Sequence, residues 1–304
     1  MDPVRVGFAG LASSHPFTDA EVLRRLGPVD LAVWADADAS ERFMRRHPAR
    51  AVRTLDELLA GDLDAAVVTV HPDDVAETVA RFLDVGVPVF VNKPAAVDRS
   101  QLARLASVRR DDVPLMSTSV IRFAPEIVRL RENVAAATDG DLLSVRAVIR
   151  HDIGHWLRGD RDWQDRPGGG GLLTTMGIHG VEVLVSLVGP DLVSVTAEVG
   201  RRHYRAVQSE DVAVLTMRWA SGVLGVVEVL GVADHESYEF TSHHAAGDTT
   251  CRLDGSGPDP VHELGYLGTM RAFRRMAATR QPAVPWSETA AVLGALADAR
   301  AGRR

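Results

Sequence analysis

The feature that most constrains the fold is the alternation of short apolar runs with helix-like segments over the first 120 residues. Such alternation predicts an α/β fold, in which a doubly wound parallel sheet carries helices on both faces. Apolar runs predict strands over residues 4–9, 31–35, 65–70, 87–91 and 115–119. Helical spacing predicts helices over residues 19–26, 41–46, 55–59, 73–85 and 100–108.

A glycine and three polar residues directly follow predicted strands: Gly10, Asp36, His71 and Lys93. The ligands of doubly wound sheets bind outside the carboxyl ends of the strands, near the switch in strand order. We therefore expect these four residues to gather along one edge of the sheet.

The first strand–turn–helix unit resembles a dinucleotide-binding turn, in which glycines let a phosphate approach backbone N–H groups. The expected G-x-G-x-x-G reads Gly10-Leu11-Ala12-Ser13-Ser14-His15, so only its first glycine is present. The methyl group of Ala12 narrows the approach to a pyrophosphate, and His15 replaces the glycine that lets the helix pack closely. The hydroxyls of Ser13 and Ser14 offer hydrogen bonds to phosphate instead.

The position of Asp36 after the second predicted strand suits a carboxylate that accepts hydrogen bonds from a ribose and repels a 2′-phosphate. A helix N-cap or a loop acid is the alternative. We predict NAD as the cofactor, with NADP not excluded. The predicted cofactor-binding residues are Gly10, Ala12, Ser13, Ser14, His15, Asp36, His71, Asn92 and Lys93.

Lys93 is the only lysine of the chain, because lysine and arginine total 34 and the remaining 33 are arginines. A compact ammonium shifts its pKa readily, whereas a guanidinium is broad and stays protonated. A single lysine among so many arginines therefore suggests a position where arginine would not serve, although persistence by chance is the alternative.

After residue 120 the pattern changes, and we predict two domains, 1–120 and 121–304. Strand-like runs over 142–153, 193–199, 212–219, 223–230, 238–242 and 249–253 predict a mostly antiparallel sheet. Predicted helices over 172–188, 268–278 and 288–299 group on one face, which makes this an α+β domain.

A run of four glycines, 168–171, precedes the predicted helix 172–188 and lets its first turns approach a ligand. In that helix Thr175 and His179 stand four residues apart and share one face. A histidine satisfied in the core is the alternative for His179. His151 and His155 have the same spacing, but Gly154 and the strand-like context argue against a metal site, so no metal is predicted.

Composition excludes several classes of function. The net charge is −7 with no long basic run, so we predict no nucleic-acid or membrane partner. One cysteine, Cys251, excludes an internal disulfide and a thiolate metal cluster, and it fits a reducing compartment. The N-terminus lacks a signal-peptide pattern, and no apolar stretch reaches the roughly 18 residues of a membrane span. The expectation is a cytoplasmic protein.

Four motifs in order resemble the Gfo/Idh/MocA family of NAD(P)-dependent oxidoreductases over almost the whole chain. They are Asn92-Lys93-Pro94 for the family's E-K-P, Arg122-Phe123-Ala124-Pro125, the glycine-to-histidine stretch that ends at His179, and the pair Glu210-Asp211. The resemblance implies a Rossmann domain followed by an open-faced sheet domain, with the nicotinamide between them. It also implies catalytic roles for Lys93 and His179, and we predict a third catalytic residue in Thr175, which stands at the position of the family's aspartate.

The predicted substrate-binding residues are Lys93, Arg122, His151, Thr175 and His179. We expect hydride transfer between NAD(H) and a CH–OH group of a sugar, cyclitol or similar polyhydroxy substrate. One alternative is a redox-inactive family member that binds a sugar or nucleotide as a sensor or scaffold; another is a lyase or hydrolase that uses bound NAD transiently. An open sheet face needs cover, which predicts a homodimer or homotetramer.

Overall fold

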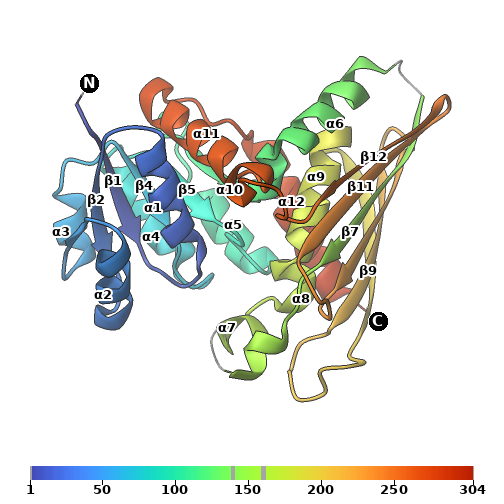
Figure 1. Cartoon of the computed structure of the whole chain (residues 1–304), viewed down its shortest axis with the longest axis horizontal. Coiled ribbons are helices and arrows are strands. Elements are labelled where there is room, and N and C mark those ends of the chain that lie inside the picture. Colours follow the sequence, from blue (N-terminus) through green and yellow to red (C-terminus); the bar gives the residue numbers. More distant parts are fainter. Residues whose placement is uncertain (1, 138–140, 159–161, 304) are drawn as a thin grey trace. The chain divides into compact units, whose positions relative to one another are not determined.

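The computed structural model describes residues 2–137, 141–158 and 162–303, which divide into two compact units (Figure 1). The first unit comprises Met1–Ala96, Ser100–Thr118 and Tyr266–Trp286. The second comprises Val97–Arg99, Ser119–Gly265 and Ser287–Arg304. Among the helices of the described residues, none combines the length and apolar character that crossing a membrane requires.

The first unit is built on a six-stranded sheet in the order β3-β2-β1-β4-β5-β6, with every neighbouring pair parallel. The order reverses between β1 and β4, which is the switch point of a doubly wound sheet. This confirms the α/β prediction. The strands are β1 (Val4–Ala9), β2 (Val29–Trp34), β3 (Arg50–Ala51), β4 (Ala65–Val68), β5 (Val89–Asn92) and β6 (Leu115–Thr118).

Helices cover both faces of this sheet (Figure 1). They are α1 (His15–Arg25), α2 (Ala37–Arg46), α3 (Leu55–Leu59), α4 (Val75–Asp84), α5 (Arg99–Ser107) and α11 (Tyr266–Thr279). The first helix was predicted to begin at residue 19, but it begins at His15. Its first turn accommodates Pro16, because the backbone N–H that proline lacks has no partner within the first turn of a helix. The late helix α11 packs against α1 and belongs to the first unit.

The second unit contains a six-stranded sheet in the order β12-β11-β7-β10-β9-β8. Only β7 and β10 pair in parallel, so the predicted antiparallel character is confirmed. Along β7, Val145, Ala147 and Ile149 face the core. The strands are β7 (Leu142–Arg150), β8 (Leu192–Gly200), β9 (Val212–Trp219), β10 (Leu224–Leu230), β11 (Ser237–His244) and β12 (Gly247–Leu253).

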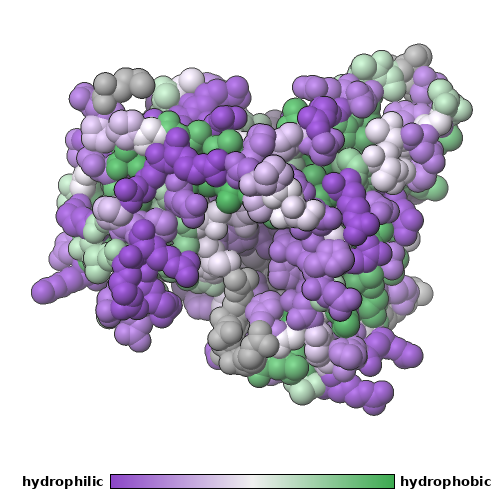
Figure 2. Space-filling view, viewed as in Figure 1, coloured by the Kyte–Doolittle hydropathy of each residue, from purple (hydrophilic) through white to green (hydrophobic). Residues whose placement is uncertain are grey.

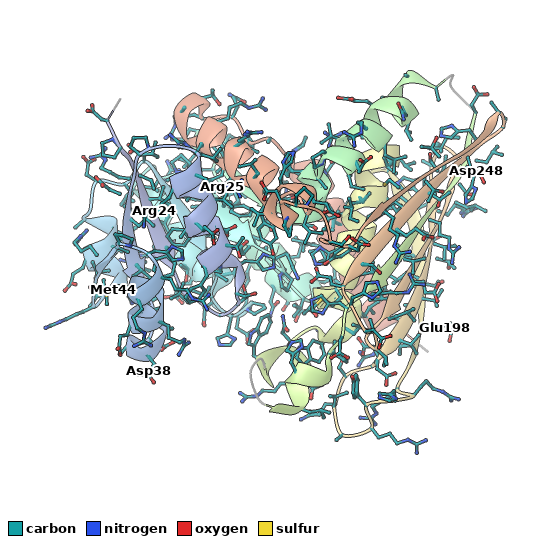
Figure 3. The ribbon with its side chains drawn as sticks, viewed as in Figure 1. Arg24, Arg25, Asp38, Met44, Glu198 and Asp248 are labelled. Atoms are coloured by element: carbon teal, nitrogen blue, oxygen red, sulfur yellow. The ribbon has the colours of Figure 1, made fainter. Side chains whose placement is uncertain are left out.

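Helices of the second unit gather on one face of its sheet, where α9 contacts β7 and β10 and α6 contacts β12 (Figure 1). The helices are α6 (Pro125–Ala136), α7 (Asp162–Asp165), α8 (Gly171–Thr175), α9 (Gly177–Val188), α10 (Pro260–Glu263) and α12 (Trp286–Ala301), with 3-10 turns η1 (Val120–Phe123) and η2 (Gly154–Arg158). Where the sheet meets solvent, hydrophobic and hydrophilic atoms interleave (Figure 2). Glu198 projects outward from β8 there (Figure 3).

The helix predicted over residues 172–188 is interrupted at Met176, which separates α8 from α9. The hydroxyl of Thr175 donates to the carbonyl of Gly171, 2.7 Å away, and this bond back to the preceding turn bends helices. Gly177 follows, and glycine costs about 1 kcal/mol relative to alanine in a helix interior. Thr175 and His179 therefore lie on two separate short helices.

Candidate active site

The first unit has a pocket of about 410 Å³ at the carboxyl edge of its sheet. It lies where β1, β2 and β4 end, next to the switch point, and its volume falls in the range of small-molecule sites. The structure thus brings together four of the predicted cofactor residues: Gly10, Ala12, Asp36 and His71 line this pocket.

Gly10 is required by the backbone at the start of the turn. Its φ is +79°, and an added Cβ would lie 2.6 Å from the carbonyl oxygen of Thr69. The turn is tied to the neighbouring strands, because Gly10 N–H donates to the carbonyl of Trp34 at 2.8 Å and Ala12 N–H to that of Thr69 at 2.9 Å. The turn can therefore keep this backbone path beside the pocket only because residue 10 has no side chain.

Ser13, Ser14 and His15 form the passage from this turn into α1. Ser14 is the N-cap residue, but its side chain makes no capping hydrogen bond. Ser13 Oγ accepts from the backbone N–H of His15 at 3.3 Å. The ring of His15 is buried against Tyr266, with ring centres 5.6 Å apart, which favours a packing role for His15 over the predicted contact with the cofactor.

Asp36 combines the two roles that the sequence leaves open. It is the N-cap of α2, with Oδ1 accepting from Ala39 N–H at 2.8 Å. The residue is also exposed and lines the pocket. The cap uses one oxygen of the carboxylate, so capping and acceptance of a ribose hydroxyl are compatible.

Asn92 is the last residue of β5 and Lys93 follows it, and both are buried. The Asn92 amide donates to Asp19 Oδ2 at 3.0 Å and to Thr69 Oγ1 at 2.9 Å, so both of its N–H groups are used inside the unit. Burial raises the pKa of Asp19 to about 7, against the opposing effect of the Asn92 hydrogen bond. Asn92 therefore ties the end of β5 to α1 and to the residue that follows β4.

In the second unit, the glycine run lets the chain turn tightly into α8. Gly170 and Gly171 have φ values of +97° and +62°. A Cβ on Gly169 would lie 1.7 Å from the carbonyl oxygen of Trp163, which leaves no room for a side chain.

The motif pair Glu210-Asp211 holds this region together. Glu210 Oε1 accepts from Leu173 N–H at 2.7 Å and so caps α8. Asp211 accepts from three consecutive backbone N–H groups, those of residues 202–204, at 2.6–2.8 Å. Burial alone would raise the pKa of Asp211, but these donors outweigh burial and hold the pKa below its usual value. The pair is structural.

His179 lies on α9, and only 3% of its surface is exposed. Its Nδ1 is 2.6 Å from Ser119 Oγ, which comes from the residue just before η1. The ring stands edge-on to that of Tyr238, with ring centres 5.3 Å apart and an interplanar angle of 69°. Two contacts thus fix the orientation of the imidazole.

Arg122 is enclosed by carboxylates. Its Nη2 lies 2.6 Å from Glu288 Oε2, and its Nη1 lies 3.9 Å from Glu182 Oε1. Its side chain is 6% exposed, and those of Glu182 and Glu288 are 4% and 20% exposed. This placement favours a link between η1, α9 and α12 over the predicted substrate contact.

Thr175 and His151 differ in their access to a ligand. Thr175 is fully buried with its hydroxyl bonded to Gly171, which does not favour the predicted role on reacting atoms. His151 is partly exposed, and its Nε2 lies 3.7 Å from Glu236 Oε2. Glu236 in turn accepts a hydrogen bond from the hydroxyl of Tyr238, the residue that contacts the His179 ring. His151 is therefore connected to His179 through Glu236 and Tyr238.

Other chemistry finds little support in the described parts of the chain. There, no group of three or more His, Cys, Asp or Glu side chains is placed to hold a metal ion. Burial raises the pKa of the Cys251 thiol to about 12, so the thiolate that nucleophilic chemistry needs is scarce at neutral pH.

Three partners in these networks were absent from the predicted site: Asp19, Ser119 and Glu182. Ser119 N–H donates to Glu182 Oε2 at 2.6 Å. Ser119 stands 60 residues from His179 and 63 from Glu182, so no local spacing signals these contacts. For Asp19, the one available signal was an acidic residue on the apolar side of a predicted helix.

Residues 127–256 match the family model described as the GFO/IDH/MocA C-terminal domain. A trans-1,2-dihydrobenzene-1,2-diol dehydrogenase from Bos taurus is 31% identical over 222 residues, which cover 71% of this chain and 64% of that protein. A dTDP-3,4-didehydro-2,6-dideoxy-alpha-D-glucose 3-reductase from Actinomadura kijaniata is 29% identical over 224 residues, covering 71% of this chain and 66% of that protein. The matches thus span slightly under two thirds of the length of these relatives.

Among solved structures, GenD2 from gentamicin A biosynthesis, solved in complex with NAD, resembles this chain with a TM-score of 0.86. The two are 24% identical, and the superposition covers 99% of this chain and 94% of that one. This likeness extends over both sheets, so it confirms the fold along the whole described chain.

Proposed function

Because the chain belongs to the Gfo/Idh/MocA family, we propose that it is an oxidoreductase that transfers a hydride between NAD(H) and a CH–OH group of a polyhydroxy substrate. A sugar, a cyclitol or a derivative of either is the substrate class. The relatives support this class, since their names describe a diol dehydrogenase and a reductase of a nucleotide-linked sugar.

The observation that carries the proposal is the pocket at the carboxyl edge of the first sheet. A glycine in the left-handed conformation, the short turn that it begins and a strand-end carboxylate line this pocket, and these groups suit a dinucleotide. Asp36 would hold the adenosine ribose, and the Gly10–Ala12 turn would lie against the phosphates. Bound NAD(H) supplies the hydride acceptor or donor.

The chain itself would supply the proton chemistry. In alcohol oxidation, His179 accepts the hydroxyl proton, because imidazole titrates near neutral pH. Lys93 stabilises the negative charge that develops on the substrate oxygen. In the reverse direction His179 returns the proton to that oxygen. The burial of both residues keeps competing water away and strengthens these interactions.

The redox-inactive alternative would keep the pocket but not the proton chemistry. A panel of polyols and sugar derivatives, followed at the nicotinamide absorbance band, separates the two functions. An oxidoreductase changes this band in step with turnover, and mass spectrometry of the native protein identifies the nucleotide that co-purifies. Nucleotide binding without any such change across the panel would contradict the proposal.

The proposal includes assembly into a homodimer or homotetramer through the outer face of the second sheet. Val214, Leu224 and Val226 are 37%, 54% and 37% exposed on this face. Threonine pairs flank them, Thr196 with Thr216 and Thr241 with Thr250. A second copy of the chain would cover this surface. We also propose a cytoplasmic location, because a chain with a single cysteine forms no internal disulfide and so suits a reducing compartment.

A further inference from the structure

The hydrogen bond between His179 and Ser119 bears on which ring nitrogen carries the proton. A neutral imidazole has one N–H and one lone pair, and the partner of one nitrogen decides the state of the other. At 2.6 Å, Ser119 Oγ engages Nδ1, so exchange of a proton with a substrate falls to Nε2.

Ser119 is held in place independently of His179. Its backbone N–H donates to the buried carboxylate of Glu182 at 2.6 Å, and the residue has no exposed surface. Its Oγ accepts from the N–H of Ile121 at 3.2 Å. The hydroxyl is therefore presented to the imidazole from a fixed backbone.

A hydroxyl differs from a carboxylate as a histidine partner because it both donates and accepts. The residue four positions before His179 is Thr175, and its hydroxyl is bonded to the carbonyl of Gly171. Nδ1 of His179 thus contacts a neutral oxygen from outside its own helix. Of the two arrangements that this contact permits, only Nδ1–H donating to Ser119 leaves a lone pair on Nε2.

We propose that Ser119 is a positioning residue that sets the tautomer of His179, with Nδ1–H donating to Ser119 Oγ so that Nε2 accepts the substrate proton. The requirement for a lone pair at Nε2 rests on the proposed function. The edge-on contact with Tyr238 holds the ring plane, so the loss of the Ser119 hydroxyl should change the proton position more than the ring position.

Nitrogen-15 NMR of the full-length protein labelled at its histidines tests this tautomer, because protonated and unprotonated ring nitrogens resonate far apart. His179→Gln identifies the His179 signals by their disappearance. The wild type should carry its proton on Nδ1 at a pH where the ring is neutral. In Ser119→Ala the proton should move to Nε2, which imidazole side chains prefer in water. Ser119→Thr should restore the wild-type pattern.

Ser186→Ala is the matched control, since it removes a hydroxyl on the same helix that donates to the carbonyl of Val183 at 2.7 Å. It should leave the His179 signals unchanged. A wild type with its proton on Nε2, or a Ser119→Ala variant with an unchanged tautomer, would overturn the inference. The signals of the other histidines report whether each variant is folded.

Kinetics separate this inference from the proposed function. If both hold, Ser119→Ala lowers kcat at least about 10-fold, a fraction of what a general base supplies, while KM changes little. Ser119→Thr recovers kcat. A protein without dehydrogenase activity but with the expected tautomers would refute the proposed function alone. Full activity in Ser119→Ala despite a changed tautomer would overturn the positioning role.

Discussion

The amide of Asn92 donates a hydrogen bond to the fully buried carboxyl group of Asp19, 3.0 Å away across the first unit. The family resemblance places a glutamate where Asn92 stands, so this chain has an amide at that position and a carboxyl group behind it. Burial keeps the pKa of Asp19 near 7, which links this pair to the pH dependence of stability.

The stability contribution of Asp19 should fall as pH rises. In the unfolded chain Asp19 ionises near pH 4, whereas in the folded protein it stays protonated until about pH 7. The folded state therefore binds more protons between these values, and the free energy of unfolding decreases with pH across them. Asp19→Asn removes this effect, so its free energy of unfolding relative to the wild type should increase from pH 4 to pH 7.

Three pKa units set an upper bound of about 4 kcal/mol on that relative gain. Urea denaturation at a series of pH values measures it. Asp30→Asn, at an exposed aspartate of β2, is the matched control for the loss of one carboxyl group elsewhere in the unit, and the gain for Asp19→Asn should exceed any change that it gives. A difference for Asp19→Asn that stays constant with pH would mean that Asp19 is ionised in the folded protein.

Asp36 should make the protein prefer NAD(H) over NADP(H). A 2′-phosphate would face its carboxylate, and such like-charge contacts cost several kcal/mol, so the preference should be at least about 10-fold in Kd. Asp36→Asn should reduce this preference while retaining the α2 cap, because asparagine caps helices as well as aspartate does. Calorimetric titration with both cofactors measures it.

The control for the cap is Thr54→Ala, which removes the Thr54 Oγ1 bond to Glu57 N–H at the start of α3. It should cost about 1 kcal/mol of stability and leave the cofactor preference intact. Tighter binding of NADPH by the wild type would contradict the role of Asp36.

Lys93→Arg should lower turnover at least about 100-fold, in the range that general acid–base and electrostatic groups supply. The guanidinium is too broad for the buried space of Lys93 and does not titrate. Stability and NAD affinity should be kept, and Arg129→Lys on the exposed side of α6 should be silent. His179→Ala should give a comparable loss, and the double variant should lose much less than the product of the two. Near-normal turnover in Lys93→Arg would remove the argument from the single lysine.

Arg122→Ala should destabilise the second unit without acting selectively on substrate binding. It leaves Glu182 and Glu288 without their cation, and breaking a buried ion pair costs about 3–5 kcal/mol. Glu288→Gln in the Arg122→Ala background should recover part of the loss, because it removes one of the stranded charges. Denaturant unfolding measures the stability. A large rise in KM with unchanged stability would instead support the predicted substrate contact.

The outer face of the second sheet should mediate self-association. Val226 lies between Thr216 and Arg146 in the sheet register, so Val226→Glu places a charge in the middle of this face. It should lower the molar mass measured by light scattering to 32.8 kDa, that of one chain. Val85→Glu, at an apolar residue that is 56% exposed in the first unit, should not. A wild-type protein that is already monomeric would refute the assembly.

Apart from the two-residue β3, the strands of both sheets could be predicted because each is a short apolar or alternating run. Gly10, Asp36 and His71 could be placed together because parallel strands end at one edge. The helix α6 could not, since only Ile127 and Leu130 are buried along it and the apolar spacing is weak. The break at Met176 depends on a hydroxyl that bonds backwards along the helix, which apolar spacing does not register.

The reactive groups of the candidate site could be predicted from the sequence, but the residues that hydrogen-bond to them could not. Strand ends and family motifs point to Asn92, Lys93 and His179, but the residues that contact Asn92 and His179 come from elsewhere in the chain. Asp19 reaches the end of β5 from α1, 73 residues before Asn92, and Ser119 reaches His179 from before η1. Such contacts arise only once the elements have packed.

The position of α11 sets an order in which the protein can be completed during synthesis. Tyr266 lies against His15 at the start of α1, and the ring centres of Phe273 and of Phe90 in β5 are 6.2 Å apart. A nascent chain that has emerged only to residue 120 holds every strand of the first sheet but leaves these apolar surfaces uncovered. The strands of the first unit thus leave the ribosome first, but this unit can be completed only after nearly the whole second unit has been translated.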